Sequence, residues 1–354
     1  MNAQFTQHNL IFKQASGTSR GVLTTKETYL LEISKNGQKG IGECAIFRGL
    51  SYDDVPDYEE KLTWLCKNIN LDFEVLKKEL LHYPSIIFGL EQALLNLEHG
   101  EDLYFPSDFT DGKDSIKING LIWMGNADFM QSQIEEKLAK GFDCIKLKIG
   151  VDWKSEKEII KKLREKFPKE QLELRVDANG AFSYEEATIV LQELADLGIH
   201  SIEQPIKKSQ VKTKKSQKTD EINSTDYCAP WNEMAKLCAE TPTPIALDEE
   251  LIGVIDFEEK KKLLETIKPQ YIILKPALVG GFSGSDEWIV LAESLGIDWW
   301  ITSALESNIG LNAICQYTYT KKNPLPQGLG TGALFTNNFE THLQLEGDQM
   351  WHKK

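Results

Sequence analysis

A chain of 354 residues is longer than one hydrophobic core usually supports, so its length predicts a large domain and a smaller one. Hydrophobic residues make up 41% and charged residues 27% of the chain, which excludes a disordered or fibrous protein. The net charge of −14, the lack of an export signal and the lack of a long apolar run predict a cytoplasmic protein without nucleic-acid or membrane partners.

Residues 1–115 are predicted to form an α+β domain. The alternating segment TYLLEISKNGQKGIGECAIF predicts a β-hairpin whose turn is Asn36-Gly37. Apolar residues then recur at intervals of three and four, which predicts two amphipathic helices, YEEKLTWLCKNI and IIFGLEQALLNLEH.

Residues 116–325 show short apolar runs that alternate with amphipathic segments, the pattern of parallel βα units in an α/β barrel. The expected strands are IKINGL, CIKLKIG, LELRVDA, SIEQP, PIALDE, YIILKP and WWITSA. Polar residues near their C-terminal ends recur every 26 to 29 residues, with one exception.

The exception is an interval of 45 residues between Glu203 and Asp248. It contains a polar, lysine-rich insertion near residues 207–231 that lacks helical or strand periodicity. We interpret this insertion as a surface loop without a chemical role. The alternative is a basic segment that binds a partner.

Lys146 and Lys148 are two residues apart on a predicted strand, so both side chains point to one face. An exposed edge strand would explain this pair alone. However, a charged residue also ends each of the next four strands: Asp177, Glu203, Asp248 and Lys275. Four solvated edges cannot occur in one parallel sheet, so we expect these side chains to converge at the C-terminal mouth of the barrel.

Three buried carboxylates would repel one another unless a cation lay between them. Asp177, Glu203 and Asp248 are therefore predicted to bind a hard divalent metal ion, Mg²⁺ or alternatively Mn²⁺. The alternative is a set of ion pairs between these acids and the lysines, although buried pairs rarely repay their desolvation.

As an ordered set, these motifs resemble the muconate-lactonising branch of the enolase superfamily. The matching segments are Gly42-Glu43-Cys44-Ala45, Lys146-Leu147-Lys148, Asp177-Ala178-Asn179-Gly180, Glu203-Gln204-Pro205, Asp248-Glu249 and Leu274-Lys275-Pro276. The resemblance implies a modified TIM barrel, (β/α)7β. It also implies a capping domain at 1–115 that residues 326–354 complete, and a lid loop near 14–21.

The resemblance also implies roles for individual residues. Lys148 and Lys275 would be catalytic, acting next to the carboxylate of a small-molecule substrate, and an enediolate would form. Lys146 and Asn179 would contact the substrate. Arg20 in the lid loop is a further candidate, although an arginine there is equally explained as surface charge.

The segments Ser303–Leu311 and Gly328–Gly332 resemble the corresponding segments of o-succinylbenzoate synthases of menaquinone biosynthesis. That resemblance implies a dehydration in which Lys148 acts as base and then as acid. The succinyl group would be held through hydroxyl and backbone N–H groups of Thr302, Ser303, Gly328 and Gly330. The alternative is that Ser303 and Glu306 cap a helix and that the glycines form ordinary turns.

Two other functions stay open. A dipeptide epimerase or N-acylamino acid racemase would use Lys148 and Lys275 on opposite faces of the substrate. Dipeptide epimerases typically carry an Asp-x-Asp pair where this chain has Gly330-Thr331-Gly332. A catalytically inactive barrel that serves as a scaffold would have lost a ligand or a lysine, and all are present. The sequence does not predict an oligomeric state.

Overall fold

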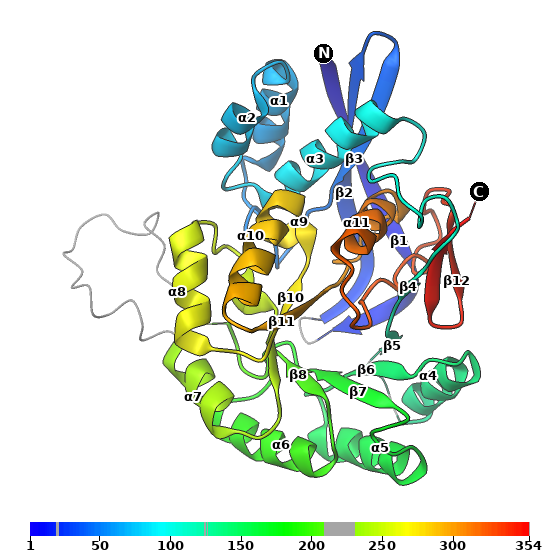
Figure 1. Ribbon diagram of the computed structural model, residues 1–354, viewed down its shortest axis with the longest axis vertical. Coiled ribbons are helices and arrows are strands. Elements are labelled where there is room, and N and C mark those ends of the chain that lie inside the picture. The colour runs from blue at the N-terminus through cyan, green and yellow to red at the C-terminus, as the bar shows by residue number, and fades with distance from the viewer. Residues whose placement is uncertain (19–20, 124, 126, 209–230, 354) are drawn as a thin grey trace, which may run out of the picture.

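A computed structural model describes residues 1–18, 21–123, 125, 127–208 and 231–353 (Figure 1). The first sheet is antiparallel and is built from β1 (Asn2–Thr18), β2 (Gly21–Lys35) and β3 (Gln38–Cys44). Lys35 pairs with Gln38, and the two residues between them have positive φ, 54° at Asn36 and 83° at Gly37. The predicted Asn36-Gly37 hairpin turn is confirmed.

Three helices complete the N-terminal part: α1 (Tyr58–Asn68), α2 (Phe73–Glu79) and α3 (Pro84–His99). Helix α3 packs directly on β3, where two glycines allow the backbones to approach. A Cβ atom at Gly42 would lie 1.9 Å from the carbonyl oxygen of Gly89, and one at Gly40 would lie 2.1 Å from that of Ala93. This close packing explains the two glycines of the strand.

The second sheet holds seven strands in the order β11-β10-β9-β8-β7-β6-β5, all parallel. Its strands are β5 (Gly120–Ile122), β6 (Cys144–Lys148), β7 (Glu173–Asp177), β8 (Ser201–Glu203), β9 (Ile245–Leu247), β10 (Tyr271–Leu274) and β11 (Asp298–Ile301). Gln327 and Gly328 pair with Ile118 on one edge and Thr302 on the other, so they form a short eighth strand. The predicted (β/α)7β barrel is confirmed.

The helices that follow the barrel strands are α4 (Ala127–Ala139), α5 (Trp153–Lys166), α6 (Tyr184–Asp196), α7 (Asn232–Glu240), α8 (Phe257–Ile267), α9 (Pro276–Val279), α10 (Gly281–Ser294) and α11 (Asn308–Lys321). Figure 1 shows α5 to α8 as an arc around the strands. Outward-facing Ile145 and Leu147 belong to the core between strands and helices, so Lys146 points to the barrel interior.

Arg175 lies deeper in the barrel than the strand ends. Its guanidinium carbon is 4.2 Å from the centre of the Trp300 ring, and its Nη1 donates to Pro326 O.

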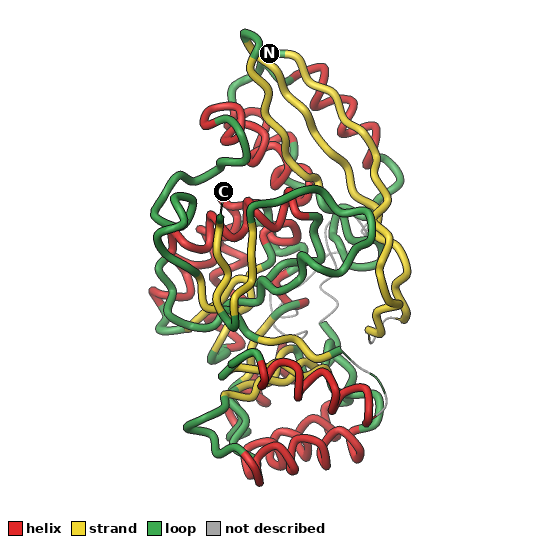
Figure 2. The backbone as a smooth tube through the Cα atoms, turned by 90° about the vertical axis from the view of Figure 1, so that its right-hand side faces the viewer, coloured by secondary structure: helices red, strands yellow, loops and turns green. Residues whose placement is uncertain are grey.

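The C-terminal segment connects the barrel to the first sheet. Strands β12 (Leu343–Glu346) and β13 (Gln349–His352) form a hairpin that pairs with β4 (Ile116–Lys117). Before it, Lys13 N donates to Leu334 O at 2.8 Å and Thr336 N donates to Ile11 O at 2.9 Å. Figure 2 shows the long strands β1 and β2 running from the N-terminal end of the molecule toward the barrel. The segment 326–354 thus supplies the last barrel strand as well as contacts to β1.

Arg20 and most of the predicted insertion, residues 209–230, lie outside the described part of the chain. Within the described part, no helix combines the length and the apolar character needed to cross a membrane.

Candidate active site

Six charged side chains come together at the C-terminal ends of the barrel strands. Lys148, Asp177 and Glu203 lie at one level, because Lys148 pairs with Asp177 and Asp177 pairs with Glu203 on neighbouring strands. Asp248 follows β9 and Lys275 follows β10. Strands β6 and β10 occupy the second and sixth of eight barrel positions, so Lys148 and Lys275 face each other across the mouth.

The lysines of β6 bind the first two carboxylates. Lys146 Nζ donates to Glu203 Oε2 at 2.6 Å and lies 3.4 Å from Asp177 Oδ2. Lys148 Nζ donates to Asp177 Oδ2 at 2.8 Å and to Asn179 Oδ1 at 2.6 Å. Asn179 also donates from its backbone to Asp177 Oδ1 at 3.1 Å, so this residue fixes the position of both partners.

Lys275 binds the carboxylates from the opposite wall. Its Nζ donates to Asp248 Oδ2 and lies 3.4 Å from Glu203 Oε1. The three carboxylate residues are each at most 2% exposed. Their environment therefore has a low dielectric constant, where uncompensated charge is costly.

Burial and the lysines act in opposite directions on the pKa values of the carboxylates. Burial alone would raise the pKa of Asp177, but Lys148 and Lys146 hold it below its ordinary value. Burial and the neighbouring Glu249 raise the pKa of Asp248 well above its ordinary value, although Lys275 opposes this. A cation beside Asp248 would lower this pKa, because positive charge favours the ionised carboxylate.

The donor set fits a hard divalent ion, because Asp177, Glu203 and Asp248 offer only carboxylate oxygens. In this structure lysine ammonium groups contact these oxygens. Among the described residues, one group of three His, Cys, Asp or Glu side chains has ligand atoms that all lie within 4.8 Å of one another. This group is Asp102, His342 and His352, and it does not include the barrel carboxylates. The three barrel carboxylates would therefore have to move closer together to share an ion.

A pocket opens above these charges, and it contains most of the predicted substrate-binding residues. Its charged and amide lining comprises Lys146, Lys148, Asn179 and Lys275. A further part of the wall is formed by Thr302, Ser303, Gly328, Gly330 and Thr331. Arg20, the remaining candidate, lies outside the described residues.

The wall residues differ from the expectation in two respects. The N–H groups of Thr302, Ser303 and Gly328 already donate to Leu274 O, Gly328 O and Ile301 O, so none of the three is available to a substrate. Ser303 does not cap a helix: its hydroxyl is 2.5 Å from that of Thr331. Helix α11 begins after Ser307, whose hydroxyl accepts from Ile309 N.

Sequence reasoning missed several residues of the site. Phe47 and Leu50, which follow β3, line the pocket from the N-terminal part of the chain. Asn119 and Trp123 line it beside the first barrel strand. Glu249 also belongs to the site, because its carboxylate accepts from Asn179 Nδ2 at 3.1 Å. Its position in the Asp248-Glu249 motif was the sequence signal that could have identified it.

Three residues without the freedom of glycine adopt positive φ beside the site: Asn179 at 44°, Gln204 at 41° and Leu305 at 63°. Such backbone is costly for a residue as large as leucine and is typical of functional sites. The Gln204 side chain compensates locally, because its Oε1 accepts from the backbone N–H groups of Asp248 and Glu250 at 3.2 Å.

Comparisons with known proteins agree with this geometry. A family model described as "Enolase C-terminal domain-like" matches residues 130–221. The chain is 42% identical to an o-succinylbenzoate synthase of Desulfotalea psychrophila, with 98% of each chain covered. It is 33% identical to an N-succinylamino acid racemase of Thermus thermophilus, which covers 83% of this chain and 75% of the relative.

Solved structures show the same relationship. The crystal structure of MenC from Desulfotalea psychrophila superimposes with a TM-score of 0.84 and 40% identity, covering 99% of both chains. An o-succinylbenzoate synthase of Thermosynechococcus elongatus, solved with magnesium in its active site, has the same fold, with a TM-score of 0.73, 22% identity and 96% of both chains covered.

The capped barrel and its acidic strand ends define the class, the enolase superfamily. Within it, the full-length identity of 42% decides the family: the chain belongs to the o-succinylbenzoate synthases.

Proposed function

We propose that the chain is a carbon-oxygen lyase that dehydrates 2-succinyl-6-hydroxy-2,4-cyclohexadiene-1-carboxylate to o-succinylbenzoate, with Mg²⁺ as cofactor. The observation that carries this proposal is the 42% identity to an o-succinylbenzoate synthase over nearly the whole of both chains. The two lysines that face each other across the pocket support it, because they supply an acid/base group and a second cation.

In this proposal Lys148 performs both proton transfers. Its neutral amine takes the proton from the ring carbon that carries the carboxylate. The resulting ammonium group then returns a proton to the departing hydroxyl, so the carbon-oxygen bond breaks and water leaves as the ring becomes aromatic. Contacts with Asn179 and Asp177 at 2.6 and 2.8 Å hold the Lys148 amine on the pocket side of β6.

Asp177, Glu203 and Asp248 are the proposed ligands of the ion, and a bound Mg²⁺ would supply positive charge to the substrate carboxylate as negative charge develops there. Mn²⁺ also suits oxygen ligands. Lys146 would contact the same carboxylate, and its position in the pocket lining supports this role.

Lys275 is proposed as the cation on the opposite face of the ring, where it stabilises the negative charge after proton removal. The succinyl group would lie against Thr302, Ser303, Gly328 and Gly330. The Thr302 hydroxyl supports this placement, because it is buried and has no hydrogen-bond partner among the described residues.

A second candidate activity is racemisation of an N-succinylamino acid. The relative at 33% identity and the opposed lysines favour it. A dipeptide is less suitable, because Asp177 is the one acidic side chain among the described residues that line the pocket, and it is paired with Lys148. An N-succinylated substrate has no free ammonium group and needs no such partner.

One assay separates the two activities. The purified chain is mixed anaerobically with the cyclohexadiene substrate, with and without Mg²⁺, and the loss of diene absorbance is followed. N-succinylamino acids are tested in parallel for exchange of the α-proton in D₂O. We expect metal-dependent dehydration. Exchange of the α-proton without dehydration would contradict the proposal and would indicate that the same residues catalyse racemisation.

The cytoplasmic location and the absence of nucleic-acid and membrane partners stay predictions.

A further inference from the structure

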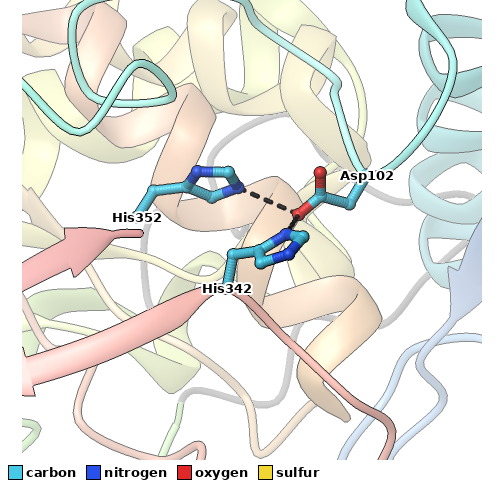
Figure 3. A group of neighbouring side chains, drawn as sticks. All are labelled: Asp102, His342 and His352. Atoms are coloured by element: carbon cyan, nitrogen blue, oxygen red, sulfur yellow. Dashed lines mark hydrogen bonds and ion pairs between the residues drawn. The ribbon is translucent and has the colours of Figure 1, made fainter. Parts of the chain in front are cut away.

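A second group of potential metal ligands lies apart from the barrel pocket. Asp102 follows α3, His342 precedes β12 and His352 ends β13, and Figure 3 shows the three side chains pointing toward one another. One ligand atom of each lies within 4.8 Å of the others. None of the three lines the barrel pocket.

Both histidines contact the same oxygen of Asp102. His342 Nδ1 lies 2.7 Å and His352 Nε2 2.9 Å from Asp102 Oδ2. The other carboxylate oxygen, Oδ1, is buried and has no hydrogen-bond partner in the described part of the chain. This carboxylate therefore has unused ligating capacity beside two imidazole rings.

The proton arrangement of His352 is fixed by its second contact. Its Nδ1 lies 3.1 Å from the carbonyl oxygen of Thr110, which can only accept, so Nδ1 carries a proton. In the neutral ring, Nε2 then directs a lone pair at the Asp102 carboxylate. Two lone pairs at this distance repel unless a proton or a metal ion lies between them. Histidines that bind metals commonly donate their other N–H group to a carbonyl in this way.

The surroundings hold the ligands in place and leave one side open. The carbonyl oxygen of Asp102 accepts from Asn312 Nδ2 and Gln316 Nε2, both at 2.8 Å, so its backbone is fixed on α11. His352 is fully buried, whereas the His342 side chain is 45% exposed. An ion could enter from the side of His342, and water could complete its coordination.

We propose that Asp102, His342 and His352 bind one divalent transition-metal ion of the zinc class. Two imidazoles, a carboxylate and water form a ligand set that suits Zn²⁺. Tetrahedral ligands at about 2.0 Å from the ion lie about 3.3 Å apart. The half-exposed His342 would therefore move outward by a few tenths of an ångström. The ion would fasten the C-terminal hairpin to the connection between α3 and β4.

The test is a Zn²⁺ titration of the full chain after removal of metals with a chelator. Excess Mg²⁺ is present to occupy the barrel site, and binding is followed by calorimetry. We expect one zinc ion per chain and a rise in Tm. His342→Ala should weaken binding about tenfold or more. His99→Ala, an exposed histidine near Asp102 in the chain, should bind zinc like the original protein.

Asp177→Asn distinguishes the new site from the barrel, because zinc binding at the Asp102 cluster should survive it. Replacing zinc by Co²⁺ should give the visible absorption of a tetrahedral ion with nitrogen ligands, and His342→Ala should remove it. Equal zinc affinity in His342→Ala and the original protein would overturn the proposal. Loss of zinc binding in Asp177→Asn would also overturn it. The same holds if no zinc binds at about 100 µM free zinc; Asp102 would then only form an ion pair with a protonated histidine.

Discussion

At the residue scale, Gly328 and Thr302 set the shape of the pocket wall where the barrel closes. A Cβ atom at Gly328 would lie 2.3 Å from Thr302 Oγ1 and 2.9 Å from Thr302 Cβ, and rotation of the threonine side chain does not relieve the second contact. At Gly330 the nearest atom, Ile118 Cδ1, is 3.4 Å away, an ordinary contact.

We therefore expect Gly328→Ala to lower the free energy of unfolding by about 1–3 kcal/mol and to reduce kcat/KM. Gly330→Ala is the matched control and should change stability by less than about 1 kcal/mol. Urea denaturation and steady-state kinetics of both variants check this. Equal stability of the two variants would contradict the predicted clash between Thr302 and a side chain at residue 328.

The charged residues of the site could be predicted because each ends a strand of a repeating βα unit. Equal spacing placed Lys148, Asp177 and Glu203 on neighbouring strands at one level, and the structure shows this register. The contributions of Phe47 and Leu50 could not be predicted, because they depend on how the N-terminal domain packs on the barrel.

At the scale of elements, α3 holds the beginning of α10. The Glu91 carboxylate of α3 accepts from the backbone N–H groups of Phe282 and Ser283, at 2.5 and 3.2 Å. These N–H groups lie in the first turn of α10 and have no partner within the helix. The contact therefore caps one helix with a side chain from a distant segment.

This cap should make stability depend on pH. Burial raises the pKa of Glu91 from 4.5 to about 7, although bonds from Ser283 and Phe282 oppose the shift. The folded protein then binds the proton more tightly than the unfolded chain. The stabilisation is fully present below about pH 4.5 and is lost as the pH rises through about 7, by roughly 3 kcal/mol in total.

Glu91→Gln keeps an oxygen that accepts the two N–H groups but does not titrate. We expect its free energy of unfolding to decrease less than that of the original protein between about pH 4.5 and 7. Glu98→Gln, an exposed glutamate of the same helix, should leave the pH dependence unchanged. Urea denaturation across this range is the measurement, and parallel curves for all three proteins would contradict the assignment.

Six of the seven longer barrel strands were predictable from their apolar runs. The expected first strand, IKINGL, instead divides between β4, which pairs with β13, and the beginning of β5. The eighth strand was not predictable, because a strand of two residues, Gln327 and Gly328, is too short to show periodicity. The start of α11 also differs from the sequence pattern: Ser303 offered a possible cap, but the chain uses Ser307, whose hydroxyl also contacts Glu43.

At the scale of the whole molecule, Glu43 joins the N-terminal domain to the barrel mouth. This fully buried carboxylate on β3 accepts from Thr28 Oγ1 at 2.9 Å, Ser307 N at 3.0 Å and Gly310 N at 2.9 Å. Ser307 follows the segment Thr302–Leu305 that lines the pocket. Glu43 therefore stabilises both the interface between the domains and the pocket wall.

Glu43→Ala should leave these donors unpaired and lower the free energy of unfolding by at least about 2 kcal/mol. It should also raise KM, because the pocket wall loses its support. Glu43→Gln retains an acceptor oxygen and should fall between Ala and the original protein. Denaturation and substrate titrations of the series check the order, and an alanine variant with unchanged stability and KM would refute the anchoring role.

The division into an N-terminal α+β part and a barrel was predictable from the change in periodicity near residue 116. How the C-terminal segment is used was less accessible, since it depends on pairing between residues more than 200 positions apart, such as Gln349 with Lys117. The Asp102 cluster illustrates this: its two histidines lie in the last 13 residues, and its carboxylate follows α3.

In the proposed dehydration Lys148 transfers the proton, so the decisive measurement is turnover of the cyclohexadiene substrate by Lys148→Ala. The exposed Lys154→Ala is the matched control, and equal Tm values would show that both variants are folded. We expect Lys148→Ala to lose activity by about 10³-fold or more, while Lys154→Ala keeps it. Near-normal dehydration by folded Lys148→Ala would contradict the mechanism.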